Sequence, residues 1–437
     1  MDKRFINETT AIIPIVLLAA FIWYFFAPGY MSSDSFVQYG SALEGVYPDN
    51  HPVIMSYIWH YLMKVIPGPQ SLLIFHTLLL MGGIYFWHKN SASKLTSLAI
   101  VLLFMMPWVI NFAGVLWKDV GMAFALLAGS ALLLNSKGNK KIALASAPFL
   151  LYALAVRYNS ILAIIPMVFM GLVFILPRTA YWKSVLITIA IVVVSFLFVK
   201  FVTYNVIHAE RKNYEVLLMG DDIAKISAET QQTLLPNIKD SDLQACTPMP
   251  ILYERALCFI ARGYDKNGIL TPEMPYKEVR KLWLDTILAN PLLYAEMKVT
   301  AFLYFLRDPS LEPVTSWLPG INKNIYHLVV SRPEMVKKLE GYVMGAQQSF
   351  LGEFFKPYIW LIISLLMLPA ALLIKKSAPR SQIIALNLSS LGCFFSLLLA
   401  VPSVDFRYSY WCIIAATVSL VIFGTALADK NKQAATM

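Results

Sequence analysis

The sequence predicts an all-α, polytopic membrane protein with about ten transmembrane helices and a mainly helical domain outside the membrane. Of its 437 residues, 58% are hydrophobic, and the mean hydropathy is +0.61. Charged residues make up only 14% of the chain, whereas roughly 25% is usual for soluble domains. Apolar stretches of near-spanning length alternate with short polar loops along most of the chain. We therefore expect a lipid bilayer around the protein.

The basic residues are distributed as membrane topology requires. The formal net charge is +10, but the excess lies in short loops between apolar stretches. Each short loop that we assign to the cytoplasm carries at least two basic residues, and the short outer loops carry balanced charges. This pattern predicts cytoplasmic N- and C-termini, and it removes the argument for a nucleic-acid partner. The first apolar stretch lacks a small-residue cleavage site, so we expect it to remain as a span.

Residues 1–203 are expected to form an N-terminal transmembrane module with about seven spans. We place these spans at about residues 10–27, 70–87, 95–110, 120–134, 142–156, 161–176 and 184–202. A long outer loop, residues 28–69, separates the first two spans. Residues 53–67 of this loop are apolar but too few for a span, which predicts an interfacial or re-entrant helix.

The composition changes near residue 204. Residues 204–357 are mixed polar and nearly charge-balanced, with turn residues such as Gly263, Gly268 and Pro272. They are numerous enough for an outer domain of ordinary size. Residues 358–437 form a C-terminal transmembrane module, with about three spans near residues 358–374, 383–401 and 409–427.

The cysteines divide between the two kinds of region. Cys246 and Cys258 fall in the outer domain, where they could pair in an oxidising compartment or remain buried free thiols. Cys393 and Cys412 lie in spans, and we expect them to be packing residues. No Cys or His spacing predicts a structural zinc site.

The ionisable residues near the spans gather on the predicted outer side. Such groups are costly at membrane depth, so they tend to be paired or functional. Four separate outer loops supply them, and sites built from several loop ends on one face of a scaffold are common. The candidate site residues are Asp34, His51, Lys118, Asp119, Arg157, Asp405 and Arg407.

Asp34 lies in the Ser-rich start of the first outer loop and has two interpretations. Ser33 or Asp34 followed by an amphipathic run is ordinary helix N-capping chemistry. The functional interpretation is a general base, with Gln38 one turn along on the same helix face. Glu44 is a second candidate carboxylate, although a regular helix would place it off the Asp34 face.

The remaining candidates also have structural alternatives. Lys118 and Arg157 could bind a phosphate. Alternatively, Lys118 could form an ion pair with Asp119 at the membrane interface, and Arg157 could be an ordinary arginine at the end of a span. Asp405 and Arg407 could instead form a local ion pair in a tight turn. The His51-Pro52 pair could simply begin a helix.

The order of these motifs resembles that of the GT-C superfamily, the multi-span glycosyltransferases that use polyprenyl-phosphate sugars. The shared features are an acidic first outer loop, a His-Pro at the start of a short helix, a Lys-Asp pair after the third span, and an Asp-x-Arg-Tyr before the last span. They correspond here to Asp34, His51-Pro52, Lys118-Asp119 and 405–408. Within the superfamily, the chain is similar in length, span number and large periplasmic loop to the bacterial and phage serotype-converting O-antigen glucosyltransferases.

This resemblance implies an inverting transfer of a sugar, glucose in that subfamily, at the periplasmic face of a bacterial inner membrane. The donor would be an undecaprenyl-phosphate sugar and the acceptor O-antigen or another surface polysaccharide. Asp34 would take the proton from the acceptor hydroxyl. Lys118, Asp119, Arg157 and Arg407 would serve the phosphate side of the site, and His51 and Asp405 would orient donor or acceptor. Many members have paired acidic residues in the first loop, but serines flank Asp34, so we expect no metal and no cofactor.

Two other functions remain open from the sequence. An O-antigen polymerase or ligase would have several arginines in its large outer loop as the main polar feature. A non-enzymatic transporter of lipid-linked sugars would have charged or broken segments near the midplane, and repeated halves. Here the charges lie at span ends and no repeat is seen, but Pro14, Pro166 and Pro369 interrupt spans.

Overall fold

The computed structural model describes residues 3–90, 95–176, 179–213, 215–235, 274–307, 309–313, 316–399 and 404–435. Within these ranges the chain is helical, and the only extended pairing is a set of isolated bridges between loops. The all-α class predicted from the sequence is therefore confirmed for the described residues. Cys246, Cys258 and the turn residues Gly263, Gly268 and Pro272 lie outside them.

The first half of the chain forms a bundle with two short helices in its first long loop. Its α-helices are α1 (Lys3–Phe26), α2 (Ser33–Glu44), α3 (Val53–Val65), α4 (Gln70–Asn90), α5 (Thr96–Phe104), α6 (Pro107–Ile110), α7 (Lys118–Leu134), α8 (Lys140–Ala145), α9 (Ala147–Val156), α10 (Ile161–Ile175) and α11 (Tyr181–Phe201). A 3₁₀ turn, Tyr158–Ser160, precedes α10, and a π turn, Val202–Val206, follows α11.

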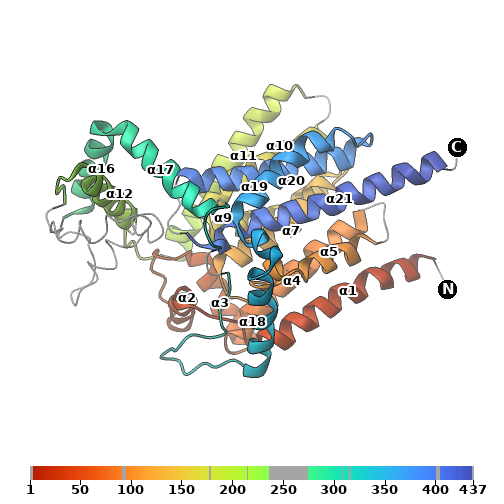
Figure 1. Cartoon of the computed structure of the whole chain (residues 1–437), viewed down its shortest axis with the longest axis horizontal. Helices are drawn as coiled ribbons and strands as arrows, with labels where there is room; N and C mark the ends of the chain where they lie inside the picture. The colour runs from red at the N-terminus through yellow and green to blue at the C-terminus, as the bar shows by residue number, and fades with distance from the viewer. Residues whose placement is uncertain are drawn as a thin grey trace.

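The second half completes the bundle and adds a small group of helices at one end. These helices are α12 (Glu215–Thr230), α16 (Tyr276–Ala289), α17 (Pro291–Leu306), α18 (Pro333–Gln347), α19 (Pro357–Ala371), α20 (Ser377–Leu399) and α21 (Tyr410–Ala435). Helices α12, α16 and α17 lie at one end of the bundle, and α1 and α21 reach the other (Figure 1). We call the first of these the domain end.

Helix α7 forms the centre of the bundle. Almost all of its residues are buried, because the helix is apolar on every side and packs against α4, α9 and α21. A second group of packed helices forms around α20, which contacts α10, α19 and α21. The small group at the domain end has a separate core, in which Ile223 and Ile226 of α12 meet Met297 and Ala301 of α17.

Five helical segments of the described chain are long and apolar enough to cross a membrane. They are Gln70–Lys89, Tyr158–Ile175, Tyr181–Val206, Ser377–Leu399 and Phe406–Ala428. Ile12–Phe26 and Pro357–Ala371 are shorter apolar helices. Eight of the ten predicted spans each overlap one helix, but the span at 95–110 is divided between α5 and α6, and the span at 142–156 between α8 and α9. Helices α5 and α9 have 9 and 10 residues, about half of the length that a span needs. The chain is a helical membrane protein, and ten spans remain a prediction.

Candidate functional site

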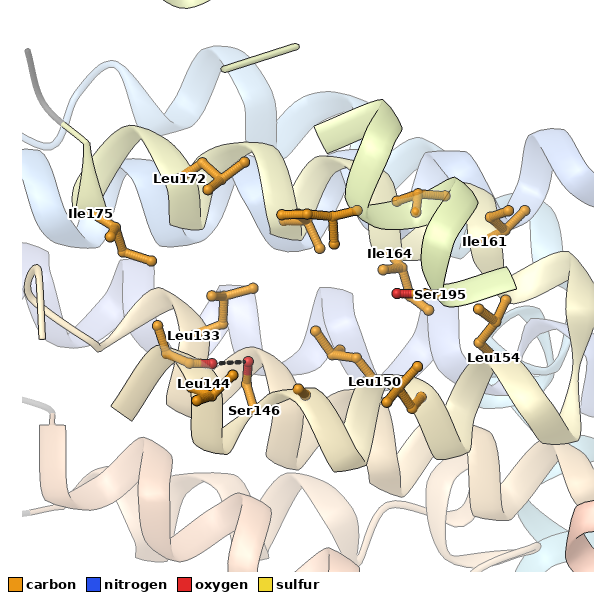
Figure 2. Close-up of a pocket in the computed structure, with 16 residues that line it drawn as sticks. Leu133, Leu144, Ser146, Leu150, Leu154, Ile161, Ile164, Leu172, Ile175 and Ser195 are labelled. Atoms are coloured by element: carbon orange, nitrogen blue, oxygen red, sulfur yellow. Dashed lines mark hydrogen bonds between the residues drawn. The ribbon is translucent and has the colours of Figure 1, made fainter. Parts of the chain in front are cut away.

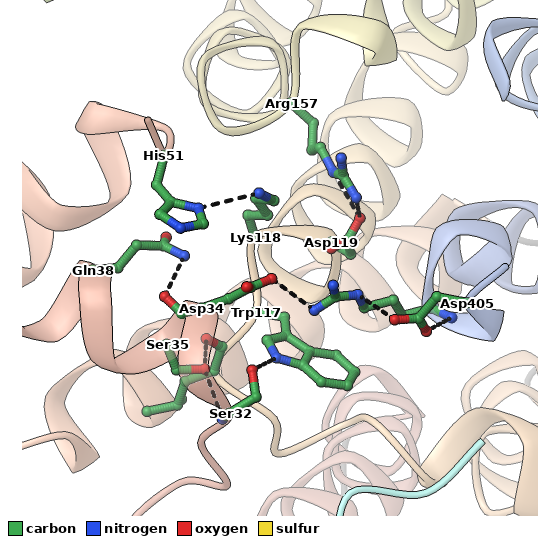
Figure 3. A network of polar contacts seen from close by, with 12 residues as sticks. Ser32, Asp34, Ser35, Gln38, His51, Trp117, Lys118, Asp119, Arg157 and Asp405 are labelled. Carbon is green, nitrogen blue, oxygen red and sulfur yellow. Dashed lines mark hydrogen bonds and ion pairs between the residues drawn. The ribbon is translucent and has the colours of Figure 1, made fainter. Parts of the chain in front are cut away.

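The structure brings all of the sequence-predicted site residues into one polar network at the domain end (Figure 3). The network forms where α2, α7 and the turn before α21 meet, beside the end of α9. Its direct contacts join Asp34 to Arg407, Arg407 to Asp405, Lys118 to His51, and Arg157 to Asp119. The alternative residue Glu44 is exposed at the last position of α2 and does not take part.

Backbone hydrogen bonds fix the chain just before α2. The amide of Tyr30 donates to Gly114 O at 3.0 Å, and the amide of Leu116 donates to Tyr30 O at 2.9 Å. On the other side, the amide of Met31 donates to Gly320 O at 3.0 Å. Gly114 is required for this approach, because a Cβ there would lie 2.2 Å from Phe26 Cβ. The start of α2 is therefore held between two loops that are distant in the sequence.

Ser32 caps α2, and this differs from the expectation that Ser33 or Asp34 would be the cap. Ser32 and Ser35 form a reciprocal capping box. The Ser32 hydroxyl also accepts a hydrogen bond of 2.7 Å from Trp117 Nε1, and Ser35 Oγ donates to Leu116 O at 3.0 Å. Since these serines satisfy the helix start, the Asp34 carboxylate is free to point into the network.

Asp34 forms an ion pair with Arg407. Its Oδ2 lies 3.0 Å from Arg407 Nη1, and Arg407 Nε lies 2.8 Å from Asp405 Oδ2. The local ion pair expected within 405–408 is therefore present, but it extends to the first loop. The guanidinium group lies over the Trp117 ring, 4.5 Å from its centroid. The Asp34 side chain keeps 28% of its surface exposed, so a ligand can still reach it.

The charges around Asp34 decide its ionisation. Burial would raise the pKa of this carboxyl, but the positive charges of Arg407 and Lys118 and the nearby His51 together lower it below its ordinary value. Burial instead raises the pKa of Asp405, against the opposing charge of Arg407. Of the two carboxylates paired with Arg407, Asp34 is thus the one whose pKa is lowered, and it remains partly exposed.

Lys118 contacts His51, not its sequence neighbour Asp119. The Nζ atom lies 3.4 Å from His51 Nδ1. A lysine only donates hydrogen bonds, so Nδ1 must accept and the His51 proton sits on Nε2. Burial and the Lys118 charge lower the pKa of His51 to about 4, and burial and the Arg157 charge lower the pKa of Lys118 to about 8. In the described part of the chain, Lys118 makes no ion pair with a carboxylate.

Asp119 pairs with Arg157, so the predicted Lys118–Asp119 pair is not formed. Nε and Nη2 of Arg157 both donate to Asp119 Oδ1, and the Nε bond measures 2.7 Å. The side chain of Asp119 is only 2% exposed. Arg157 also lies over the Tyr408 ring, 4.8 Å from its centroid. Arg157 and Arg407 are thus both paired with carboxylates, whereas Lys118 is not, so the charge of Lys118 is the one available to an anionic ligand.

An apolar cavity of about 330 Å³ lies between α7–α9 on one side and α10 and α11 on the other (Figure 2). Leu154 and Ile161 line one end, and Leu144 and Ile175 line the other. Leu154 and Ile161 lie three residues before and four residues after Arg157 in the sequence, so this end of the cavity is the one nearer to Arg157. The cavity suits an apolar chain whose polar end lies near Arg157.

Sequence reasoning missed the aromatic part of the site. Trp117 and Tyr408 provide ring faces for Arg407 and Arg157, and Trp117 also joins Ser32 to the network. The signal was available, because each ring is directly adjacent to a predicted charged residue in the sequence. Aromatic residues near span ends are common in membrane proteins as an interfacial belt, so their position alone does not indicate a site. Among the described residues, no three His, Cys, Asp or Glu side chains gather as metal ligands.

No protein-family model matches the chain, and neither the curated proteins nor the solved structures contain a match. The class of the protein is therefore defined by the chain itself. It is a helical membrane protein with a charged, partly accessible network at one end of its bundle and an apolar cavity between α7–α9 and α10–α11.

Proposed function

We propose that the protein is an integral membrane glycosyltransferase of the GT-C type. It moves a sugar, glucose by the subfamily resemblance, from undecaprenyl phosphate to O-antigen or another surface polysaccharide on the periplasmic face of a bacterial inner membrane. One observation carries the proposal. An accessible, ionised Asp34 lies in a network of cations, and one end of an apolar cavity is lined by residues within four positions of Arg157 in the sequence. An enzyme with a lipid-linked phosphate donor needs these elements in this arrangement.

The donor fits the two parts of the site. The apolar cavity takes part of the polyprenyl chain, and its end at Leu154 and Ile161 directs the phosphate towards Arg157 and Lys118. Lys118 provides the point charge for the phosphate, because Arg157 is already paired with Asp119. The Nε2 proton of neutral His51 is a further donor for a phosphate or sugar oxygen.

Asp34 acts as the general base in this mechanism. The acceptor hydroxyl oxygen forms a bond to the anomeric carbon while the bond from that carbon to the phosphate oxygen breaks. The hydroxyl proton passes to Asp34, and the electron pair of the broken bond stays on the phosphate, where Lys118 stabilises it. A single displacement of this kind inverts the anomeric configuration. Arg407 must turn from Asp34 towards the donor phosphate, with Asp405 as its remaining partner.

The test uses the unmodified protein in nanodiscs with undecaprenyl-phosphate glucose and a panel of other polyprenyl-phosphate sugars. We expect transfer to a lipopolysaccharide acceptor and an anomeric configuration in the product opposite to that of the donor, as read by NMR. A protein that polymerises or ligates lipid-linked glycans without transferring a single sugar would be the polymerase or ligase considered above. Movement of the intact lipid-linked sugar across vesicles, with no transfer, would indicate the transporter. Either result would overturn the proposed function.

A further inference from the structure

Helix α11 ends in a group of aromatic rings around one lysine. Lys200 Nζ lies 4.5 Å from the ring centroid of Tyr158, 5.7 Å from that of Phe196 and 5.6 Å from that of Tyr204. Each distance is within the range of a cation–π contact. Among the described residues, no carboxylate forms an ion pair with Lys200. We call these four residues the lysine cage.

The lysine cage is built by helical spacing and held by the first outer loop. Phe196, Lys200 and Tyr204 follow each other at intervals of four, so they lie along one stripe of the chain. The helix widens into a π turn at Val202–Val206, and such turns are frequent at functional sites. Tyr204 Oη donates to Asp49 Oδ2 at 2.9 Å, which joins the cage to the loop that carries Asp34 and His51.

The lysine cage lies just beyond the end of the apolar cavity that Leu154 and Ile161 line. Val192 and Ser195 of α11 line the cavity, and Lys200 lies about 7 Å further along the same helix. Tyr158 lies between the cavity residues Leu154 and Ile161 in the sequence, directly after Arg157. An apolar molecule in the cavity would therefore have its polar end between Lys200 and Arg157.

The surroundings of α11 indicate that the cage opens towards lipid. The helix has many exposed apolar side chains near its end, including Val193, Val194, Leu197, Phe198 and Phe201. These side chains would face the acyl chains of a bilayer. Phe196 of the same helix and Tyr204 of the π turn that follows it are half-buried. Ring contacts hold a lysine only weakly at a partly exposed site. Lys200 can therefore leave them for a phosphate, which offers a stronger, charge-assisted bond.

We infer that the lysine cage captures the phosphate headgroup of a polyprenyl-phosphate lipid just beyond this end of the cavity, before the headgroup moves on to Arg157 and Lys118. The identity of the lipid rests on the proposed function, whereas an anionic headgroup with an apolar tail is indicated by the cage and the cavity themselves. The competing explanation is a lysine that only extends its charge to the membrane surface. That explanation gives Lys200 no preference for a particular lipid.

The test compares Lys200→Gln and Lys200→Arg with Lys183→Gln. Lys183 is a matched control, because it lies at the opposite end of α11 and also contacts a ring, that of Trp182, at 5.4 Å. Native mass spectrometry of nanodisc-released protein would measure binding of undecaprenyl phosphate and of uncharged undecaprenol. We expect Lys200→Gln to weaken binding of the phosphate at least about tenfold, since it removes a hydrogen bond between two charged groups. Undecaprenol binding should be unchanged, and Lys200→Arg should bind the phosphate nearly as well as the unmodified protein.

Transfer kinetics separate this inference from the proposed function. We expect Lys200→Gln to raise the KM for the lipid donor and to leave kcat nearly unchanged, because the cage acts before the chemical step. Equal binding of undecaprenyl phosphate by Lys200→Gln and the unmodified protein would overturn the inference, even if both transfer sugar. Displacement of the lipid by millimolar inorganic phosphate would also overturn it, since the cage would then be a site for free phosphate. Lys200-dependent lipid binding without any sugar transfer would support the inference and contradict the proposed function.

Discussion

Asp34 of α2 and Arg407 at the start of the last helical segment form an ion pair of 3.0 Å. This contact joins the loop after α1 to the turn before α21. It also keeps the proposed base ionised when no donor is bound, because Arg407 contributes to the lowered pKa of Asp34. Asp405 holds the same guanidinium group from the other side, at 2.8 Å. Arg407 is therefore positioned to exchange a carboxylate for a phosphate.

The low pKa of His51 predicts a loss of stability in mild acid. Its pKa is about 4 in the folded protein, against about 6.5 in an unfolded chain. The unfolded state therefore binds more protons between these values, and the stability falls as the pH decreases from about 6.5 to about 4. We expect the apparent Tm of the unmodified protein in detergent to fall over this window. His51→Gln should remove most of that slope.

Asp34 affects the stability of the fold in a separate pH window, which lies below the window of His51. Its pKa is lowered in the folded protein, so its stabilising effect is complete above the unfolded value of about 3.9 and is lost as the pH falls further. Asp34→Asn should consequently leave the slope between about pH 6.5 and 4 intact. The same slope in His51→Gln as in the unmodified protein would assign the acid sensitivity to another group.

The lowered pKa of Lys118 predicts that the affinity for the donor decreases under alkaline conditions. Its pKa is lowered to about 8, so the charge that we assign to phosphate binding is lost as the pH rises above that value. We expect the KM for the lipid donor to increase from about pH 8 upwards, with a smaller change in kcat. Lys118→Arg, which stays charged, should shift this increase to higher pH. A KM that is independent of pH between 7 and about 10 would contradict the role of Lys118.

Replacement of Trp117 should lower the kcat of transfer by an amount that depends on whether the new side chain keeps a ring. Trp117→Phe keeps a ring under Arg407 and removes the hydrogen bond to Ser32, and one such bond is worth about 1 kcal/mol. We expect a decrease of about fivefold in kcat for Trp117→Phe and a larger decrease for Trp117→Leu. Trp182, which is exposed, provides the control Trp182→Leu. Identical kcat values for the Phe and Leu variants would show that the ring does not position Arg407.

The buried Asp119–Arg157 pair predicts a non-additive loss of stability. Asp119→Asn leaves the Arg157 charge without its partner, and breaking such a pair costs about 3–5 kcal/mol. We expect a low apparent Tm for Asp119→Asn, and a smaller loss for the Asp119→Asn, Arg157→Gln double variant than the sum of the single losses. Additive losses in this double-mutant cycle would mean that the two side chains stabilise the protein independently.

The sequence predicted the convergence of the charged residues but not their pairing. Convergence follows from topology, because loops that leave the bundle at the same end must lie near each other. Pairing depends on side-chain direction. Lys118 and Asp119 are adjacent at the start of α7, and neighbouring residues of a helix point in different directions. Asp119 therefore turns to Arg157, and Lys118 turns to His51.

The apolar cavity and the lysine cage could not be predicted from the sequence. The cavity depends on how α7–α11 pack, and an apolar helix looks the same from its sequence whether or not it lines a cavity. The spacing of Phe196, Lys200 and Tyr204 was visible, but Tyr158, which completes the cage, comes from another segment. Helix length also escaped prediction, since α5 and α9 are much shorter than the spans assigned to them.

The most direct measurement is the single-turnover rate of sugar transfer from undecaprenyl-phosphate glucose by Asp34→Asn, with Glu44→Gln as the control from the same helix. Both variants replace a carboxylate by an amide, but Glu44 is exposed and outside the network. A general base in the proposed role predicts a rate loss of about 10²–10⁴-fold for Asp34→Asn, with normal membrane insertion and a near-normal rate for Glu44→Gln. A rate for Asp34→Asn within a few-fold of the unmodified protein would contradict the account.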